Sequence, residues 1–305
     1  MTNAAPSTSL RPPTEFPDLA APATISGARA RRTARLATAG FAFVLVLGAV
    51  AVAAPWLAPH DPTRQALRGR LTAPTLEAAD GRARLLGTDH LGRDVLSRVI
   101  YGARVSLVVG VAAVVVGGAL GAALGIAAGF RGGFTDSVIM TLADAQLAFP
   151  FILLAIGIIA VLGPSFPTLI VVIALSGWVN YARILRSQVL VLRSREFVDA
   201  IHALGGSALR VIARHILPNV LSSLVVVATL ELARAIVLEA TLSFLGLGIP
   251  PPAPSWGLMV AEGKEYMFFS PWVITIPGAA LFALVLAINL LGDGLRDIAA
   301  PENRG

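Results

Sequence analysis

The sequence of 305 residues contains no cysteine and few charged residues. The absence of cysteine excludes disulfide bonds, thiolate metal sites and cysteine nucleophiles. Charged residues make up 14% of the chain, whereas an ordinary soluble domain carries about 25%. Hydrophobic residues make up 56%, and so little polar surface could not cover a water-soluble core of that size. The composition therefore indicates a protein whose solvent is the lipid bilayer.

The basic residues outnumber the acidic ones, which gives a net charge of +6. A nucleic-acid groove would combine basic residues with stacking aromatic residues. In this sequence the basic residues instead lie between long apolar runs, where arginine sets the topology of a membrane protein. We therefore expect membrane lipid, and no nucleic acid, among the partners of this chain.

Six apolar runs are long enough to cross a bilayer, which takes about 20 helical residues. They cover residues 36–57, 105–129, 138–162, 167–185, 219–245 and 272–293. An even number of spans places both termini on one side of the membrane. Four arginines precede the first run and place that side in the cytoplasm. The predicted fold class is therefore all-α, a polytopic membrane protein with six transmembrane helices and both termini cytoplasmic.

Arginines in the connecting segments support this orientation only in part. The expected cytoplasmic segment between the fourth and fifth runs is arginine-rich, but so is the expected external segment 59–104. We keep the assignment because the first helix usually dominates orientation and the external segment is long.

The chain is expected to have three parts: a disordered cytoplasmic tail over 1–35, a transmembrane domain over 36–300 and a short tail over 301–305. The core of the transmembrane domain is expected at about 103–295. The first 28 residues are rich in Pro, Ala, Ser and Thr, as disordered segments are. An alternative is that the first run is a signal peptide cleaved near Ala51-Val52-Ala53. A signal peptide has an apolar stretch of about 7–15 residues, and this run is longer, so we expect a retained helix.

Four glycines spaced by four residues lie in the second run, at Gly117, Gly121, Gly125 and Gly129. Small residues at this spacing form one helix face and allow another helix to approach closely. This pattern favours packing within the bundle, and dimerisation of subunits is the alternative.

The segment 194–218, which we call the coupling loop, predicts a short amphipathic helix outside the membrane. Its apolar positions have helical spacing, at Phe197, Ala200, Ile201 and Leu204. Ser194 is a candidate N-cap, Gly205 and Gly206 are expected to end the helix, and Ser207 can start another. Taken alone, such a helix could lie on lipid headgroups or dock into a groove of a cytoplasmic partner.

The order of residues in the coupling loop resembles that of the permease subunits of ATP-binding-cassette (ABC) importers. The family pattern is EAA, three residues, glycine, about nine residues, then I-L-P or I-x-L-P. The matching positions here are Asp199-Ala200-Ile201, Gly205 and Ile216-Leu217-Pro218. This sequence departs from the pattern at two positions. Asp199 replaces the glutamate, and its shorter side chain would alter a contact made by that carboxylate. Ile201 replaces the second alanine, and its larger side chain would need more room on the partner.

Further stretches are similar to the dipeptide, oligopeptide and nickel branch of that family, and to its second permease subunit. They are LGTDHLGRDVLSR at 86–98, LSFLGLG at 242–248, PSWG at 254–257 and NLLGDGLRD at 289–297. The resemblance implies half of a translocation pathway for peptides or related small solutes. It also implies a second homologous permease, two cytoplasmic ATP-binding subunits and an extracytoplasmic solute-binding protein, in a bacterial inner membrane.

The resemblance assigns the contact with the ATPase to the coupling loop. The residues concerned are Phe197, Asp199, Ala200, Ile201, Leu204, Gly205, Ile216, Leu217 and Pro218. The sequence has no G-x-x-x-x-G-K-[ST] motif. We therefore expect a transport subunit that is not an enzyme and has no cofactor, with ATP and Mg on the partner subunits. The alternatives are a secondary transporter driven by an ion gradient and a membrane-embedded enzyme.

Ionisable and polar residues within the expected spans are candidates for the translocation pathway. They are Asp144, Asn180, Glu231, Arg234 and Glu239. Glu231 and Arg234 are three residues apart and can pair on one helix face, so structural pairing and solute contact both remain open.

Four external residues are candidates for an outer gate or for contact with the solute-binding protein, namely Asp89, Arg93, Asp94 and Trp256. The alternative is a loop held together by its own salt bridges. We expect no metal-ligand cluster and no catalytic triad.

Overall fold

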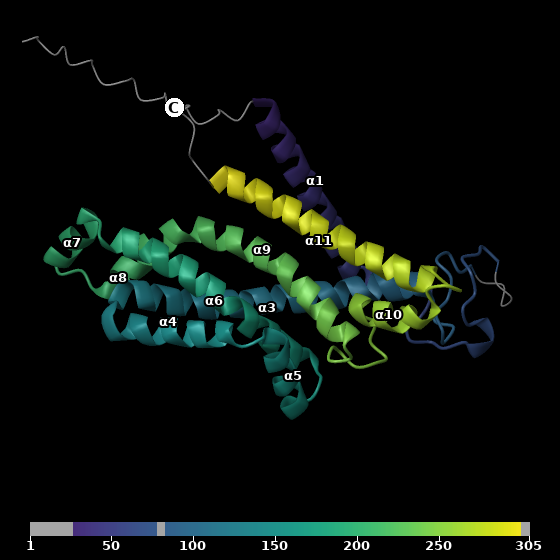
Figure 1. Cartoon of the computed structure of the whole chain (residues 1–305). Helices are drawn as coiled ribbons and strands as arrows, with labels where there is room; N and C mark the ends of the chain where they lie inside the picture. The colour runs from purple at the N-terminus through teal and green to yellow at the C-terminus, as the bar shows by residue number, and fades with distance from the viewer. Residues whose placement is uncertain (1–26, 78–82, 300–305) are drawn as a thin grey trace, which may run out of the picture.

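The computed structural model describes residues 27–77 and 83–299, and most of these residues are helical (Figure 1). Within these ranges the only β structure is two isolated bridges, Thr75 with Arg84 and Thr88 with Asp94. The predicted all-α class is confirmed. The expected tail over 1–26 and the last residues, 300–305, lie outside the described residues.

Helix α1, Gly27–Val52, begins earlier than expected. The prediction of disorder up to residue 35 is wrong for residues 27–35, because alanine and arginine there favour a helix. A short helix α2, Ala54–Leu57, follows. α1 packs closely on the last helix, α11, Trp272–Ala299: a Cβ on Gly40 would lie 2.5 Å from the carbonyl oxygen of Ala287. This packing supports a retained first helix.

Helix α3, Val95–Arg131, is the long central helix. It begins earlier than the expected second span because the Asp94 carboxylate accepts a hydrogen bond from the Ser97 N–H (2.9 Å). Its glycine face lies against α6, Phe166–Arg193. A Cβ on Gly117 would lie 2.7 Å from the Ala174 carbonyl oxygen, and Gly121 and Gly125 lie equally close to the α6 backbone. Packing within one chain therefore accounts for the glycine pattern.

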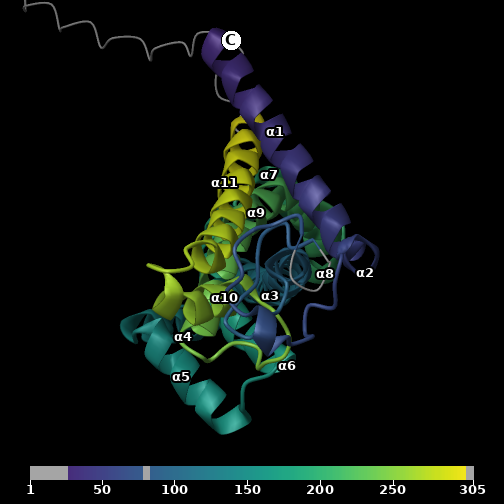
Figure 2. The ribbon, with the colours of Figure 1, turned by 90° about the vertical axis from the view of Figure 1, so that its right-hand side faces the viewer.

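The third expected span is not one continuous helix. Residues 138–162 fall on α4, Gly133–Ala148, and α5, Phe151–Leu162, which bend by 92° at a short break. Pro150 causes the break, because the residue before a proline avoids the helical conformation. Within the described residues, five continuous helices are long and apolar enough to span a membrane, or six if the bent pair is one span. α1 and α5 leave the bundle on different sides (Figure 2).

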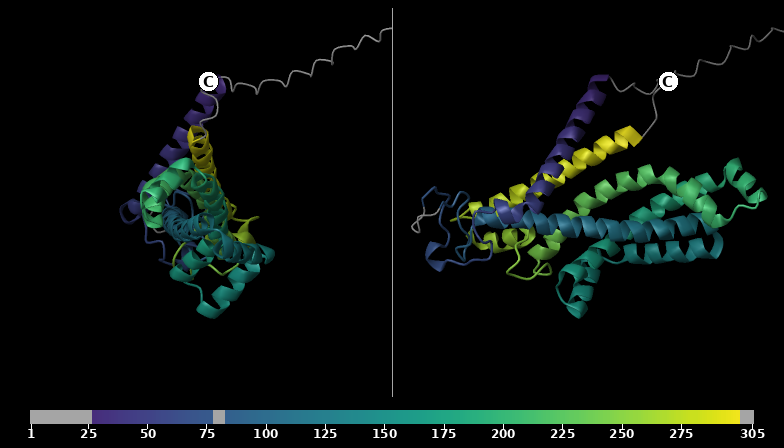
Figure 3. Two further views of the ribbon diagram at one scale, coloured as in Figure 1. Left: turned by 90° about the vertical axis from the view of Figure 1, so that its left-hand side faces the viewer. Right: turned by 180° about the vertical axis from the view of Figure 1, so that it is seen from behind.

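The second half of the chain begins with α7, Glu196–Ala203, and α8, Ala208–Val211. A π-helical turn η2, Ile212–Ile216, joins α8 to α9, Leu217–Phe244. Then follow α10, Trp256–Gly263, and the 3-10 turn η3, Lys264–Tyr266. Residues 58–77, which contain the 3-10 turn η1, Leu67–Gly69, and residues 83–94 lie with α10 at one end of the bundle. α7 lies at the other end (Figures 1 and 3).

Candidate functional site

The coupling loop contains the predicted helix almost as expected, since α7 covers Glu196–Ala203. Gly205 ends it with φ at +80°, a conformation that favours glycine. The Gly206 N–H donates to the Ile201 carbonyl at 2.8 Å, which is the long hydrogen bond of a Schellman C-cap. The predicted N-cap is wrong: the Ser194 hydroxyl donates to the Val191 carbonyl at the end of α6 (3.0 Å). Ser207 does start the next helix, because its hydroxyl accepts from the Arg210 N–H.

α7 is anchored by a residue that the apolar pattern did not single out. Val198 is 1% exposed and lies in an apolar cluster with residues of α3, α6 and α9. Ile201 packs partly against this cluster, but Ala200, Leu204 and much of Phe197 face outward, and Leu204 is 89% exposed. The single predicted apolar face is therefore divided between one buried anchor and an exposed apolar surface. The side chain of Asp199 lies outside the described part of the chain.

Ile216-Leu217-Pro218 forms the junction between the coupling loop and α9. Ile216 is fully buried, whereas Leu217 is exposed and Pro218 lies in the first turn of α9. Proline has no N–H and its ring collides with a regular helix before it. The π-helical turn immediately upstream lets the chain continue through Pro218 as one helical element.

Three predicted pathway residues meet near the midpoints of α6 and α9. The Asn180 side-chain amide donates to Glu231 Oε1 at 2.6 Å. Arg234 Nη1 lies 3.2 Å from Glu231 Oε2 and 3.3 Å from the Ser176 carbonyl oxygen. The Arg234 side chain is 46% exposed. The predicted pair of Glu231 and Arg234 is thus present, and it is joined to α6 by Asn180.

Asp144 lies on a different seam of the bundle, where α4 packs beside α6. Its carboxylate pairs with Arg183, and both side chains are exposed. A second pair joins the same helices nearer their ends, with Arg186 Nη2 2.6 Å from Asp136 Oδ2. These pairs bind the bent third span to α6.

Glu239, the fifth pathway candidate, is fully buried and does not line an exposed surface. Its carboxylate accepts hydrogen bonds from Ser106 on α3 (3.0 Å) and from Ser243 on α9 (2.8 Å). Its observed contacts thus tie α3 to α9.

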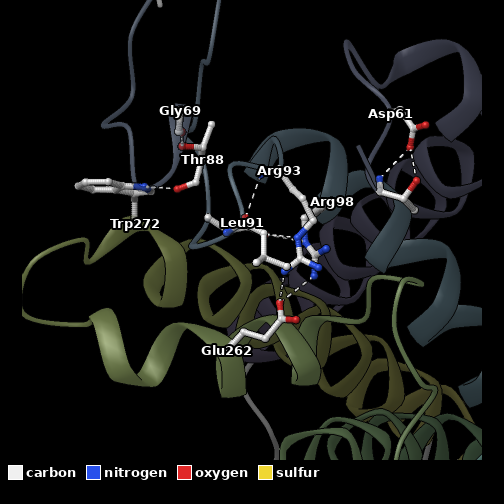
Figure 4. Close-up of polar contacts among 10 residues, drawn as sticks. Asp61, Gly69, Thr88, Leu91, Arg93, Arg98, Glu262 and Trp272 are labelled. Atoms are coloured by element: carbon white, nitrogen blue, oxygen red, sulfur yellow. Dashed lines mark hydrogen bonds and ion pairs between the residues drawn. The ribbon is translucent and has the colours of Figure 1, made fainter. Parts of the chain in front are cut away.

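The external candidates lie in a buried network of charges (Figure 4). Asp89 Oδ2 accepts from Arg93 Nε at 2.6 Å. Glu262 Oε2 accepts from both Arg93 Nη2 (2.8 Å) and Arg98 Nη2 (2.9 Å). Arg98 is 0% exposed. Asp89, Arg93 and Asp94 are buried as well, so these contacts support a loop held together by its own salt bridges.

Trp256 is also buried, and it packs α10 onto α3. Its indole N–H donates to the Val99 carbonyl at 2.9 Å. The residue before it, Ser255, caps α10 by accepting from the Leu258 N–H. A second tryptophan, Trp272 at the start of α11, donates its indole N–H to the Thr88 carbonyl at 3.1 Å (Figure 4). Trp256 therefore holds α10 against α3, and Trp272 holds the segment around Thr88 against α11.

Asp89, His90 and Glu262 bring possible metal ligands within 4.8 Å of one another, a grouping that the sequence did not predict. The two carboxylates already bind Arg93 and Arg98. A divalent cation would have to displace two buried guanidinium groups, so the charges present do not favour a metal.

The chain was compared with known proteins. Residues 121–305 match the family described as the inner membrane component of binding-protein-dependent transport systems. Residues 30–74 match the N-terminal transmembrane domain of oligopeptide transport permease C. The chain belongs to this permease family. It is accordingly the membrane permease subunit of an ABC importer, and neither a secondary transporter nor a membrane-embedded enzyme finds support in these matches.

Several relatives of this permease match along most of their length. A Brucella suis permease protein named for a peptide transport system is 44% identical, over 97% of this chain and 98% of its own. The di/tripeptide transport system permease protein DppC of Pseudomonas aeruginosa is 43% identical over 87% and 88%. The glutathione transport system permease protein GsiD of Escherichia coli is 42% identical over 90% and 89%.

Sequence reasoning missed three residues that shape these sites in the permease: Val198, Arg98 and Glu262. Val198 sits one residue from the predicted apolar face, and an eight-residue helix is too short for its pattern to choose the buried side. The partnership of Glu262 with Arg93 and Arg98 joins residues more than 160 positions apart. No local signal could reveal it.

Proposed function

We propose that this permease moves short peptides or related small solutes across the bacterial inner membrane. It would work with a second homologous permease, two cytoplasmic ATP-binding subunits and an extracytoplasmic solute-binding protein. The names of its relatives, which refer to peptide, di/tripeptide and glutathione transport, support this solute class. The observation that carries the proposal is the geometry of α7: it presents apolar side chains outward and is anchored inside to helices of the bundle.

The exposed side of α7 is the docking surface for an ATP-binding subunit. Phe197 and Leu204 present apolar surface there, and Leu209 on α8 extends it. A short helix with an apolar face is recognised by insertion into a groove. The resemblance to the family motif assigns Asp199 a role in the same contact. ATP and Mg²⁺ would bind the partner subunits, where hydrolysis takes place.

Movement of α7 can reach the middle of the bundle through physical contacts. Val198 packs with Leu185 and Val189 of α6 and with Val220 of α9. Further along the same pair of helices, Gln188 on α6 donates to Ser223 on α9 (2.6 Å). Asn180 and Glu231 are the next link. A displacement of α7 therefore shifts the two helices that carry the central polar residues.

The pathway passes beside Asn180, Glu231 and Arg234. A guanidinium that is 46% exposed at the midpoint of a spanning helix would be very costly in contact with lipid. It is tolerated where it faces water or another polar surface. The exposed side of Arg234 therefore marks the part of this permease that lines the pathway, opposite the partner permease.

The positions of α7 and α10 at opposite ends of the bundle support the expected orientation of the chain in the membrane. α7 lies at the end opposite α10 and residues 58–77 and 83–94 (Figure 1). If α7 binds a cytoplasmic subunit, the buried network around Glu262 is external, where the solute-binding protein docks. Both termini are then cytoplasmic.

Transport by the complete importer in lipid vesicles tests this proposal. We expect uptake of a labelled dipeptide that requires ATP and the loaded binding protein. Gly205→Val, which forces a β-branched residue into a positive φ, should keep ATP hydrolysis but lose most uptake. Gly205→Asn is the matched control, because asparagine tolerates that conformation. Asp199→Lys should act like Gly205→Val. Uptake without ATP hydrolysis, or full uptake by both Gly205→Val and Asp199→Lys, would overturn the proposal.

A further inference from the structure

A small cavity lies between α3, α6 and α9 at the level of the central polar residues. Apolar side chains of Ala113, Val114, Ile173 and Ala235 line part of it, and Ser176, Gly177, Tyr181 and Glu231 line the rest. The volume of the cavity is about 10 Å³. That is the room needed by one water molecule or by a group of the same size.

Tyr181 is the first polar side chain among the residues that line this cavity. The residue is 1% exposed, and its Oη has no hydrogen-bond partner among the residues that the structure describes. A buried hydroxyl without a hydrogen-bond partner lowers the stability of the folded protein. The hydroxyl can both donate and accept, so it is suited to a ligand that enters the cavity.

The carboxylate of Glu231 is the second polar group. Glycine at position 177 makes room for it, because a Cβ there would lie 3.1 Å from Glu231 Oε2. Oε1 accepts from Asn180, and Oε2 has only the 3.2 Å contact with Arg234. A carboxylate oxygen can accept more than one hydrogen bond. Oε2 therefore retains the capacity to bind a further donor.

We propose that this cavity is a subsite for a primary ammonium group of the transported solute, held by Glu231 and the Tyr181 hydroxyl. The proposal rests on the proposed function, because it names the chemical group of the solute that this part of the pathway recognises. An ammonium group has the size of water and three donors, and the cavity offers a carboxylate and a hydroxyl oxygen.

Arg234 extends the subsite and favours zwitterionic solutes. It contacts two cavity residues, Glu231 and the carbonyl of Ser176, and much of its guanidinium remains exposed. Glu231 and Arg234 together are neutral, so a solute with one ammonium and one carboxylate leaves the site neutral. A solute with a single charge would add an uncompensated charge near the middle of the membrane, which is costly. The carboxylate of a short peptide would bind the exposed side of Arg234.

The test compares uptake of alanyl-alanine with uptake of N-acetyl-alanyl-alanine by the complete importer, each at saturating loaded binding protein. The quantity measured is the ratio of the two initial rates. The same binding protein serves every variant, so its own preference cancels when ratios are compared between variants. Tyr181→Phe and Glu231→Gln should each lower the ratio about tenfold, the usual effect of losing a hydrogen bond to a charged group. Tyr101→Phe, on an external tyrosine, should leave the ratio unchanged.

A second measurement removes the binding protein altogether. Thermal unfolding of the purified permease–ATPase complex should shift upward with alanyl-alanine and not with the acetylated peptide. Tyr181→Phe should abolish that shift.

Three results would overturn the proposal. In the first, both rates fall equally and the ratio is kept, which would show a purely structural role. In the second, wild-type uptake depends on Na⁺ and Tyr181→Phe removes that dependence, which would make the cavity a site for an inorganic cation. In the third, both peptides shift the unfolding temperature alike. Failure of the proposed function would be seen differently, as the absence of ATP-dependent uptake of either peptide by the wild-type importer.

Discussion

The two ends of the bundle are held together by different forces. At the end with α10, buried arginines and carboxylates join the external segment to the bundle, and Trp256 fills the space above Gly102. At the other end, α7 is anchored by Val198 in an apolar cluster, and a Cβ on Gly205 would meet nothing within 4 Å. One end is held by ion pairs, hydrogen bonds and tryptophan packing, whereas α7 is held mainly by one apolar cluster and leaves much of its surface exposed.

This difference separates two tasks. A region with many buried contacts opens only at high free energy, whereas a segment with few contacts moves easily. The end with α10 can therefore keep one shape, which suits the proposed docking of a solute-binding protein. The coupling loop can follow a partner that changes shape and still pull on α6 and α9. The following predictions test this contrast through stability, from the largest expected effect to the smallest.

Removal of a charge from the external network should have the largest effect. Glu262→Gln leaves the buried Arg93 and Arg98 with Asp89 as their remaining acidic contact in the network. Loss of one partner of a buried ion pair typically costs 3–5 kcal/mol, and we expect about 3 kcal/mol because Glu262 is partly exposed. Unfolding of the purified protein by heat or denaturant measures this. Glu265→Gln, an exposed acid on the next turn, is the control, and equal stability of the two variants would contradict the prediction.

Addition of a single methyl group near Trp256 should cause the second-largest loss of stability. A Cβ on Gly102 would lie 2.6 Å from Trp256 Cδ1, so Gly102→Ala must displace the indole. Overpacking of this kind costs about 1–3 kcal/mol. The matched control is Gly48→Ala on α1, where a Cβ would meet nothing within 4 Å. Helix propensity alone favours alanine over glycine at both positions, so Gly48→Ala should not destabilise the protein. A destabilisation of the same size in both variants would contradict a specific clash with Trp256.

A glycine-to-alanine substitution in the coupling loop should lower the stability less than Gly102→Ala, and for a different reason. Gly205→Ala meets no neighbour, and its cost of about 1 kcal/mol comes from a positive φ. Gly205→Asn should recover most of that loss. Hydrogen exchange of the α7 amides would detect it even where global unfolding does not. A larger effect than that of Gly102→Ala would reverse the contrast between the ends.

The smallest effect on stability is expected at Leu204. This side chain is 89% exposed, so Leu204→Ser should change stability by less than about 0.5 kcal/mol. It should nevertheless weaken binding of the ATP-binding subunit, measured by co-purification. Val198→Ser, at the buried anchor of α7, should instead destabilise the coupling loop. Normal subunit binding by Leu204→Ser would remove Leu204 from the docking surface.

The local patterns of the sequence predicted the helical elements well, and failed where long-range packing decides. The helix at 196–203 and its end at Gly205 follow from spacing and glycine alone. The break at Pro150 was signalled by the proline, although the length of the apolar run suggested one continuous span. The prediction for Ser194 was wrong. Its hydroxyl could either cap α7 or donate back to α6, and the sequence does not choose between these two hydrogen bonds.

Composition alone decided that this chain lies in a membrane, because so many apolar residues and so few charges cannot form a soluble surface. Glycine and proline, through their backbone conformations, decided where several helices end. Only the tertiary structure decided which ionisable residues are buried and which are presented. Glu262 meets Arg98, and Tyr181 reaches the cavity beside Glu231, only after distant helices pack together. The free energy of a charge or a hydroxyl depends on its neighbours in space, and those neighbours come from other parts of the chain.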